Sequence, residues 1–171
     1  MAEKRQRRTL EDQYRKRRVF VAQYYDKLKG SSQDGLILPT LAEFRKLPIV
    51  KCLQSDSSMP ITGFSEELER PLIVQMIRQN LDAWQKDARS ALGQLLGEFS
   101  WKSSNRDKLH PVERPNVRFR CLKCDAKKAS TGLYRSLSFA EACQHQCPWL
   151  NKKEQAKAAW KATNFRLDPQ V

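Results

Sequence analysis

Four of the chain's five cysteines fall within 27 residues, and this grouping constrains the fold more than any other feature of the sequence. Cys121 and Cys124 form a Cys-x2-Cys pair, and after a gap of twenty residues His145 and Cys147 follow, with Cys143 just upstream. The pattern is not an even disulfide framework, and clustered cysteines in a reducing compartment more often bind metal. Because thiolates and imidazole favour zinc over hard cations, the sequence predicts a structural zinc site.

Five residues compete for the four positions of a tetrahedral zinc site. Cys143 and Cys147 are four residues apart and would share one face of an unbroken helix, which would give an all-cysteine site. However, Pro148 disfavours helical geometry at Cys147, so the helix is expected to end near His145. We therefore predict one zinc per chain, held by Cys121, Cys124, His145 and Cys147, and Cys143 remains the alternative ligand.

The sequence around these residues predicts a zinc-stabilised ββα module over residues 117–150. Val117, Phe119 and Cys121 alternate with arginines, which is the period of a short strand, and a turn at Thr131–Gly132 leaves room for a second strand. A short helix then follows, with Ser138 as its cap and Glu141 completing a capping box. The large apolar residues expected in its core are Val117, Phe119, Leu122, Leu133, Tyr134, Leu137, Phe139 and Trp149.

The spacing Cys-x2-Cys-x20-His-x-Cys, with Phe119 before the first pair and Phe139 in the helix, resembles a variant C2HC zinc finger. It is similar to fingers of poorly characterised fungal zinc-finger proteins. The resemblance covers residues 117–150, and it implies metal binding without implying sequence-specific recognition of DNA.

The rest of the chain predicts helices, so the expected fold is mainly α, a helical scaffold followed by the zinc finger. Residues 1–30 read as a basic helix with one apolar face (Leu10, Tyr14, Val21, Tyr24 and Leu28), which Arg17 interrupts. Residues 36–99 read as the scaffold, in which apolar residues step by three from Leu41 to Leu53 and Cys52 is expected to be buried. An amphipathic helix over residues 71–99 is its spine.

Two further segments complete the predicted organisation. Residues 100–116 are polar, contain two prolines and are interpreted as a linker, with His110 as a loop residue. Residues 151–171 read as a basic tail helix capped by Asn151, with Ala156, Ala159 and Trp160 facing the finger. Its lysines are the candidate nucleic-acid contacts: Lys152, Lys153, Lys157 and Lys161.

Charge favours an anionic partner. The formal net charge is +13, and it is uneven: residues 1–29 carry 10 basic and 4 acidic side chains, residues 30–100 carry 7 and 9, and residues 101–171 carry 15 and 6. Such a surplus suggests nucleic acid ahead of a membrane surface. The groups KRQRR and RKRR near the N-terminus resemble a bipartite nuclear import signal. No apolar run is long enough to suggest a membrane span or a secretory signal.

Motifs of enzymes are missing from the sequence. There is no Gly-rich phosphate loop, no Gly-x-Ser-x-Gly and no His-Glu-x-x-His, and His110 lies too close to Cys121 for a zinc deaminase. Four protein ligands would also leave zinc no open position for water. We therefore expect a nuclear, zinc-binding, non-enzymatic protein that contacts nucleic acid electrostatically, with a role in transcription. The alternative is a protein-interaction adaptor, in which the finger is a structural staple and the 71–99 helix binds a partner.

Overall fold

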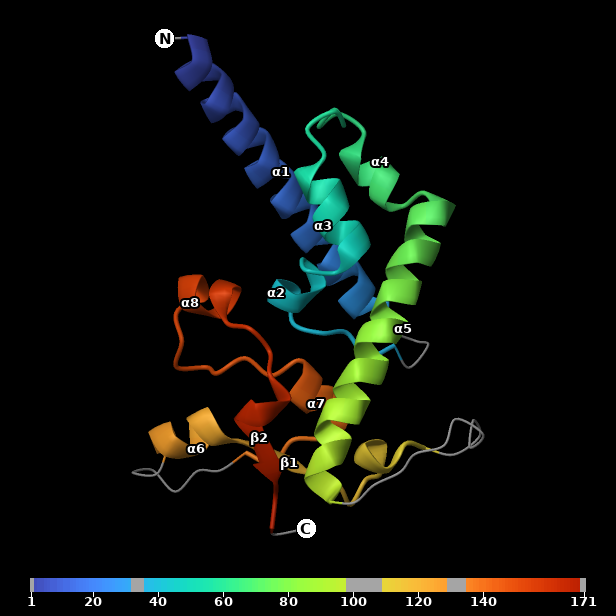
Figure 1. The fold of residues 1–171 in the computed structure, drawn as a ribbon, viewed down its shortest axis with the longest axis vertical. Coiled ribbons are helices and arrows are strands. Elements are labelled where there is room, and N and C mark those ends of the chain that lie inside the picture. Colours follow the sequence, from blue (N-terminus) through green and yellow to red (C-terminus); the bar gives the residue numbers. More distant parts are fainter. Residues whose placement is uncertain (1, 32–35, 98–108, 129–134, 170–171) are drawn as a thin grey trace. The chain divides into compact units, whose positions relative to one another are not determined.

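The chain folds mainly into helices, as the sequence predicts. The computed structural model describes residues 2–31, 36–97, 109–128 and 135–169 (Figure 1). Within them, the only sheet has two short strands. The chain divides into two compact units, one made of Met1–Leu36 and Glu43–Asp82 and the other of Ile37–Ala42 and Ala83–Val171.

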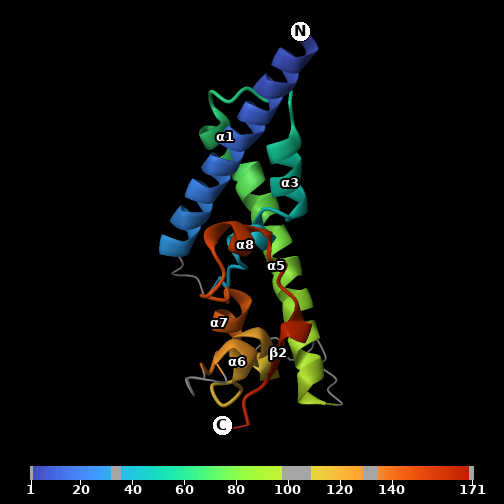
Figure 2. The same ribbon diagram turned by 90° about the vertical axis from the view of Figure 1, so that its left-hand side faces the viewer.

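The first unit is built on the long amino-terminal helix α1 (Ala2–Gly30). It packs against α3 (Pro48–Ser55) and α4 (Phe64–Leu68), and Figures 1 and 2 both show α1 alongside α3. Aromatic rings join α1 to its neighbours: Phe20 contacts Phe64 of α4, and Tyr24 and Tyr25 both contact Phe44, which precedes α3. A single turn of helix, α2 (Leu41–Phe44), precedes α3.

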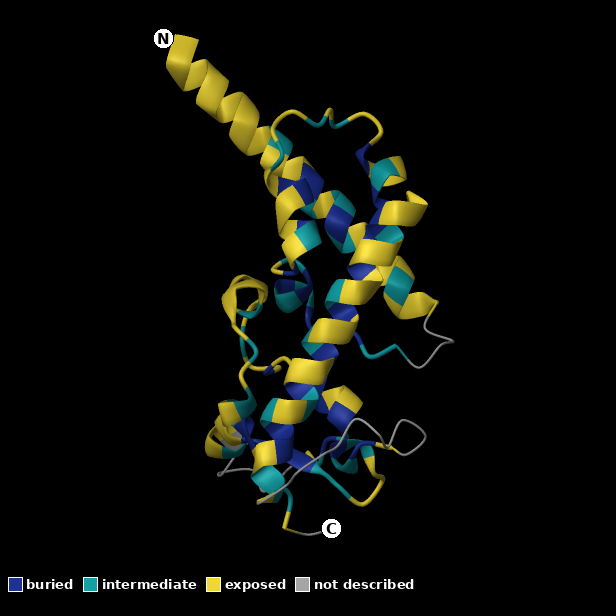
Figure 3. Cartoon of the chain, turned by 45° about the vertical axis from the view of Figure 1, so that its right-hand side comes forward, coloured by how far each residue is buried: buried dark blue, intermediate teal, exposed yellow. Residues whose placement is uncertain are grey.

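Only the carboxyl half of α1 is packed. Val21 and Tyr24 are buried as predicted, whereas Leu10 and Tyr14, on the same predicted face, are exposed. Figure 3 shows the amino-terminal turns of α1 as almost wholly exposed. Arg17 does lie on this face, and it is buried because its guanidinium donates to the Met59 carbonyl over 2.7 Å. The hydrogen bond offsets part of the cost of burying the guanidinium, whose Nε has no hydrogen-bond partner within the described part of the chain.

Four of the five apolar residues that step by three in the α2–α3 region form core, as expected, and the fifth, Leu41, is half-buried. Phe44, Leu47, Val50 and Leu53 are all buried. The prediction for Cys52 is wrong, because this cysteine is exposed. It follows Val50 by two positions and precedes Leu53 by one, so it falls outside the three-residue step and on the solvent face of α3.

The predicted amphipathic helix is α5 (Pro71–Gly93), which continues as one 3-10 turn, Gln94–Leu96; Phe99 lies outside the described residues. Its apolar stripe is buried by the chain itself. Ile73, Ile77 and Leu81 are buried in the part of the helix that belongs to the first unit. Ala88 and Leu92 are buried in the part that belongs to the second unit.

The second unit contains the cysteine-rich segment and a core of its own. Its elements are a 3-10 turn (Pro111–Glu113), β1 (Phe119–Cys121), α6 (Leu122–Lys128), α7 (Phe139–Cys143), α8 (Lys152–Lys157), a 3-10 turn (Ala162–Asn164) and β2 (Phe165–Leu167). Its buried cluster consists of Ala88, Leu92, Val112, Phe119, Cys121, Cys124, Leu137, Phe139, Ala142, Cys143, Cys147 and Phe165.

Among the described residues the predicted ββα arrangement is not shown, although its first strand and its helix are present. The partner of β1 is not the next segment but β2, which comes from the predicted tail helix and runs antiparallel, with Cys121 opposite Phe165. From the predicted second strand, Leu137 forms an isolated bridge with Phe119, and the turn at Thr131–Gly132 lies outside the described residues. Strand pairing across more than forty residues leaves no local pattern from which to predict it.

The compact units also differ from the predicted segments, in which residues 100–116 separate a 36–99 scaffold from a 117–150 module. Residues 98–108 lie outside the described part of the chain, but Val112 is fully buried in the core of the second unit. Glu113 pairs with Arg89 of α5 at 3.0 Å. The carboxyl half of α5 therefore shares a core with the metal-binding segment, because Ala88 and Leu92 supply apolar surface that the segment itself lacks.

Candidate metal centre

The first two sulfurs of the candidate site lie where β1 passes into α6. Cys121 is the last residue of β1, and Cys124 lies in the first turn of α6. A helix that begins directly after the strand turns the backbone sharply, so that side chains three residues apart point to the same side. Leu122 and Lys123, which lie between the two cysteines, are exposed.

The other two donors follow α7. This helix begins with the predicted capping box, in which the Glu141 N–H donates to the Ser138 hydroxyl and the Ser138 N–H donates to the Glu141 carboxylate. It ends at Cys143, two residues before His145, in keeping with the restriction that Pro148 places on the preceding residue. His145 and Cys147 therefore lie in non-helical chain, with one residue between them.

The predicted donors Cys121, Cys124, His145 and Cys147 come together in space, and their ligand atoms all lie within 4.8 Å of one another. The two sulfurs of Cys121 and Cys147 are 3.8 Å apart. His145 Nε2 lies 3.3 Å from the sulfur of Cys124 and 3.8 Å from that of Cys147. A zinc tetrahedron with Zn–S bonds of about 2.3 Å has S···S edges of about 3.8 Å and S···N edges of about 3.6 Å, so the four atoms fit one structural zinc.

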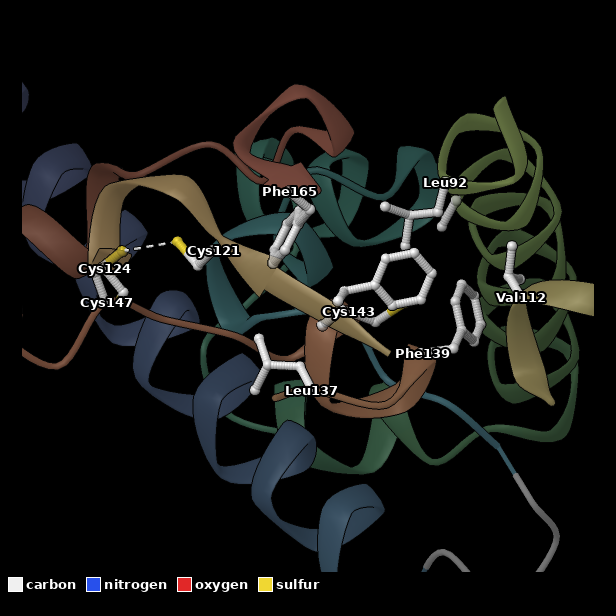
Figure 4. Packing of buried hydrophobic residues seen from close by; sticks show 12 residues of the cluster. Leu92, Val112, Cys121, Cys124, Leu137, Phe139, Cys143, Cys147 and Phe165 are labelled. Carbon is white, nitrogen blue, oxygen red and sulfur yellow. Dashed lines mark hydrogen bonds between the residues drawn. The ribbon is translucent and has the colours of Figure 1, made fainter. Parts of the chain in front are cut away.

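Cys143, the alternative ligand, lies elsewhere. It has no exposed surface and packs in the core, and Figure 4 shows it near Phe139 while Cys121, Cys124 and Cys147 lie together at one end of the cluster. Burial raises the pKa of its thiol to about 12, since an apolar surrounding disfavours the thiolate. Cys143 is excluded by its position, because it is enclosed in the core and does not belong to the group of four donor atoms that converge on one point.

The three remaining thiols differ in ionisation. Burial alone would raise the pKa of Cys121, but hydrogen bonds with the His145 ring, the Cys124 backbone and the Cys147 side chain lower it to about 6. Burial raises the pKa of Cys124, and burial together with the neighbouring Cys121 raises that of Cys147 to about 12. Neighbouring thiolates at this separation repel each other, which raises the pKa of Cys147, and a divalent cation bound by the sulfurs would remove that repulsion.

Sequence reasoning missed two residues that support the donors. The Phe165 ring contacts the His145 imidazole edge to face, with centroids 5.9 Å apart, and so helps to set the ring's orientation. The Gln155 side-chain amide donates to the carbonyls of Leu150 (2.9 Å) and Cys147 (3.4 Å), and it holds the turn that carries Cys147. Both residues lie beyond position 150, and no sequence spacing connects them to the cysteines.

An ion cluster lies beside Cys124 and was also not predicted. Arg120 is buried in β1, with its guanidinium 3.3 Å from Asp125 and 4.0 Å from Asp168. Arg166 of β2 reaches Asp125 at 3.0 Å. These pairs connect the segment after β2 to the first turn of α6. Because a buried charge is tolerated only when it is paired, the cluster helps to fix how the end of the chain packs on the cysteine pair.

The predicted basic tail is only partly helical. Asn151 caps α8 through a capping box with Glu154, and the helix ends at Lys157. The four candidate contact residues, Lys152, Lys153, Lys157 and Lys161, are all exposed. Ala156 and Ala159 are exposed as well and do not face the core, whereas Trp160 packs on it and donates its indole N–H to the Ala142 carbonyl over 2.9 Å.

The fold and the site together define a mainly helical protein with a Cys3His cluster close enough to hold a metal ion. Comparisons of the chain with protein-family models, with curated proteins and with solved structures each found no match. Among the described residues, no helix is both long and apolar enough to cross a membrane.

Proposed function

We propose that this chain is a nuclear, non-enzymatic zinc-binding protein that contacts nucleic acid mainly through phosphates and takes part in transcription. The observation that carries the proposal is the charge of the segment that holds the metal centre. Residues 101–171 contain 15 basic and 6 acidic side chains, and such a surplus favours binding to a polyanion. The basic groups KRQRR and RKRR, both within α1, support the nuclear location.

The placement of the lysines is consistent with phosphate contact. Lys152, Lys153 and Lys157 project from α8, whose capping box leaves its one acidic residue, Glu154, bonded to the Asn151 backbone. Gln155 ties the same helix to the turn at Cys147. The metal centre would therefore hold the lysines in a defined position, which lowers the entropy cost of binding.

A structural role for zinc supports the non-enzymatic part of the proposal. Four protein donors complete a tetrahedral shell, so the metal has no position left for water or substrate. The adaptor alternative has less support, because it needs an available apolar face on α5. That face is already buried within the chain, through Ile73, Ile77, Leu81, Ala88 and Leu92.

A salt titration tests the proposal. For the zinc-loaded protein and an arbitrary duplex, the logarithm of the association constant should fall linearly with the logarithm of the salt concentration. The slope should be about −0.9 for each phosphate neutralised. Replacing Lys152, Lys153 and Lys157 with Gln should lower the magnitude of the slope by up to about 2.7 and weaken binding to unrelated sequences alike. Replacing the exposed Lys46, Lys51 and Lys86 with Gln is the matched control. An affinity that does not depend on salt concentration, or that falls equally in both triple variants, would refute the proposal.

A further inference from the structure

A tight turn beside the metal centre holds one large aromatic side chain out toward solvent. The Leu150 N–H donates to the Cys147 carbonyl over 3.1 Å, so that Pro148 and Trp149 occupy the two central positions of the turn. Trp149 was expected in the core, yet 42% of its surface is exposed. Pro148 suits the first central position because its backbone angle is already set for a turn.

Several contacts hold this tryptophan in place. The turn begins at a metal donor, Cys147, and the Gln155 amide binds both the Cys147 and the Leu150 carbonyls. The position of the ring is thus set by the turn that begins at the metal donor Cys147, and part of the ring stays exposed.

The charges near the ring are positive. Lys127 of α6 places its Nζ 5.6 Å from the centroid of the Trp149 ring, and Lys123 on the same helix is exposed. Lys152 and Lys153 follow Trp149 within four residues. The acidic residues of α6 and α8 have partners already, because Asp125 pairs with Arg120 and Arg166, and Glu154 belongs to the α8 capping box.

We infer that Trp149 is a stacking platform for an unpaired nucleic-acid base, and that Lys127 contacts the phosphate next to that base. This inference rests on the proposed function and names its substrate class as single-stranded nucleic acid. A base inside a duplex has both faces covered by its neighbours, so only an unpaired base can stack on a fixed indole ring. The cations around the ring complement the phosphates that accompany such a base.

A protein partner fits this surface less well. In the described part of the second unit, the large apolar side chains that are exposed are Leu109, Leu122 and Trp149. A stable protein interface needs about 800 Å² on each partner, centred on apolar residues and poor in lysine. One aromatic ring among lysines matches the chemistry of a nucleotide instead.

The test compares Trp149→Leu with Trp149→Phe in the full zinc-loaded chain. Both variants lose the indole N–H, and only the phenylalanine keeps an aromatic face, so their difference isolates stacking from any effect on the metal centre. Zinc content is measured for each, and Leu72→Ala, which removes an exposed apolar side chain from the first unit, is the control. Binding is measured by anisotropy with decauridylate, decathymidylate and a ten-base-pair duplex.

The leucine variant should bind the two single strands about 5- to 150-fold more weakly than the parent, the effect of losing one stacked base. The phenylalanine variant should stay within about three-fold of the parent, and duplex binding should change little in either. The loss should be the same at low and high salt, since stacking releases no counterions. A preference of the parent for decauridylate would name RNA as the ligand, and equal binding of both strands would name either nucleic acid.

Two results would overturn the inference in distinguishable ways. If the parent binds all three oligomers and the leucine variant matches it, stacking at Trp149 is wrong while the proposed phosphate binding stands. If the parent binds none of them in low salt, the proposed function fails and the inference fails with it.

Discussion

Replacing Leu92 with alanine is expected to weaken zinc binding, although Leu92 is not a ligand. This residue of α5 is fully buried and belongs to the same core cluster as Cys121, Cys124 and Cys147. In structural zinc sites, folding and metal binding are coupled, so lost folding free energy appears as lost metal affinity. Truncating a buried leucine costs about 2–5 kcal/mol of folding free energy. Because about 1.4 kcal/mol corresponds to a tenfold change in an equilibrium constant, zinc affinity should fall by about 30-fold to a few thousand-fold. Structural zinc contributes about 10–16 kcal/mol, so the variant should still bind the metal.

Leu81 provides a matched control on the same helix. It is also fully buried, but its part of α5 belongs to the first unit. Leu81→Ala should lower thermal stability by a comparable amount and leave zinc affinity nearly unchanged. Both affinities can be measured by competition with a chromophoric chelator.

Amide exchange after chelation provides a second measurement of the same coupling. Residues 83–93 of α5 should lose protection together with residues 117–128 and 135–147, while the helices of the first unit keep theirs. An unchanged zinc affinity in Leu92→Ala would refute the shared core. Equal losses of affinity in the two leucine variants would instead show that the two units fold as one.

Three further predictions follow from the packing around the metal centre. A chain ending at residue 161 lacks β2 and Phe165 and should lose most of its zinc affinity in the chelator assay, whereas a self-contained 117–150 module would keep it. Iodoacetamide at pH 8 should label the exposed Cys52 in the zinc-bound protein but not Cys143, because burial shields the Cys143 thiol and raises its pKa to about 12. Mass spectrometry of peptides measures the labelling, and labelled Cys143 would contradict this prediction. Asp168→Ala should lower the free energy of unfolding of the zinc-bound protein, measured with denaturant, by about 3 kcal/mol, because it removes a partner from the buried Arg120. A loss of under about 0.5 kcal/mol would show that the ion cluster has no structural role.

The sequence predicted best what is encoded locally. The amphipathic helix that starts at Pro71 and the caps at Ser138 and Asn151 follow from short-range patterns, and the structure has all three. The effect of Pro148 on its neighbour was enough to favour His145 over Cys143 as a donor, and the structure places them accordingly.

What could not be predicted depends on contacts between distant parts of the chain. The second strand was sought near Thr131 because a hairpin is the simplest continuation, but the β1 strand pairs with residues 165–167. The burial of Val112 and the exposure of Trp149 likewise depend on which elements pack together, and neither residue's neighbours in sequence give a signal. The first feature joins α5 to the metal-binding segment, and the second leaves an aromatic ring exposed beside the metal centre.

X-ray absorption at the zinc K-edge of the purified protein tests the metal centre most directly. The structure predicts one zinc per chain with three sulfur neighbours at about 2.3 Å and one nitrogen at about 2.0 Å, the distances of a thiolate–imidazole site. The spectrum should be unchanged in Cys143→Ser and should lose the nitrogen shell in His145→Ala. A four-sulfur shell that loses one sulfur in Cys143→Ser, or protein that carries no zinc at all, would contradict the account.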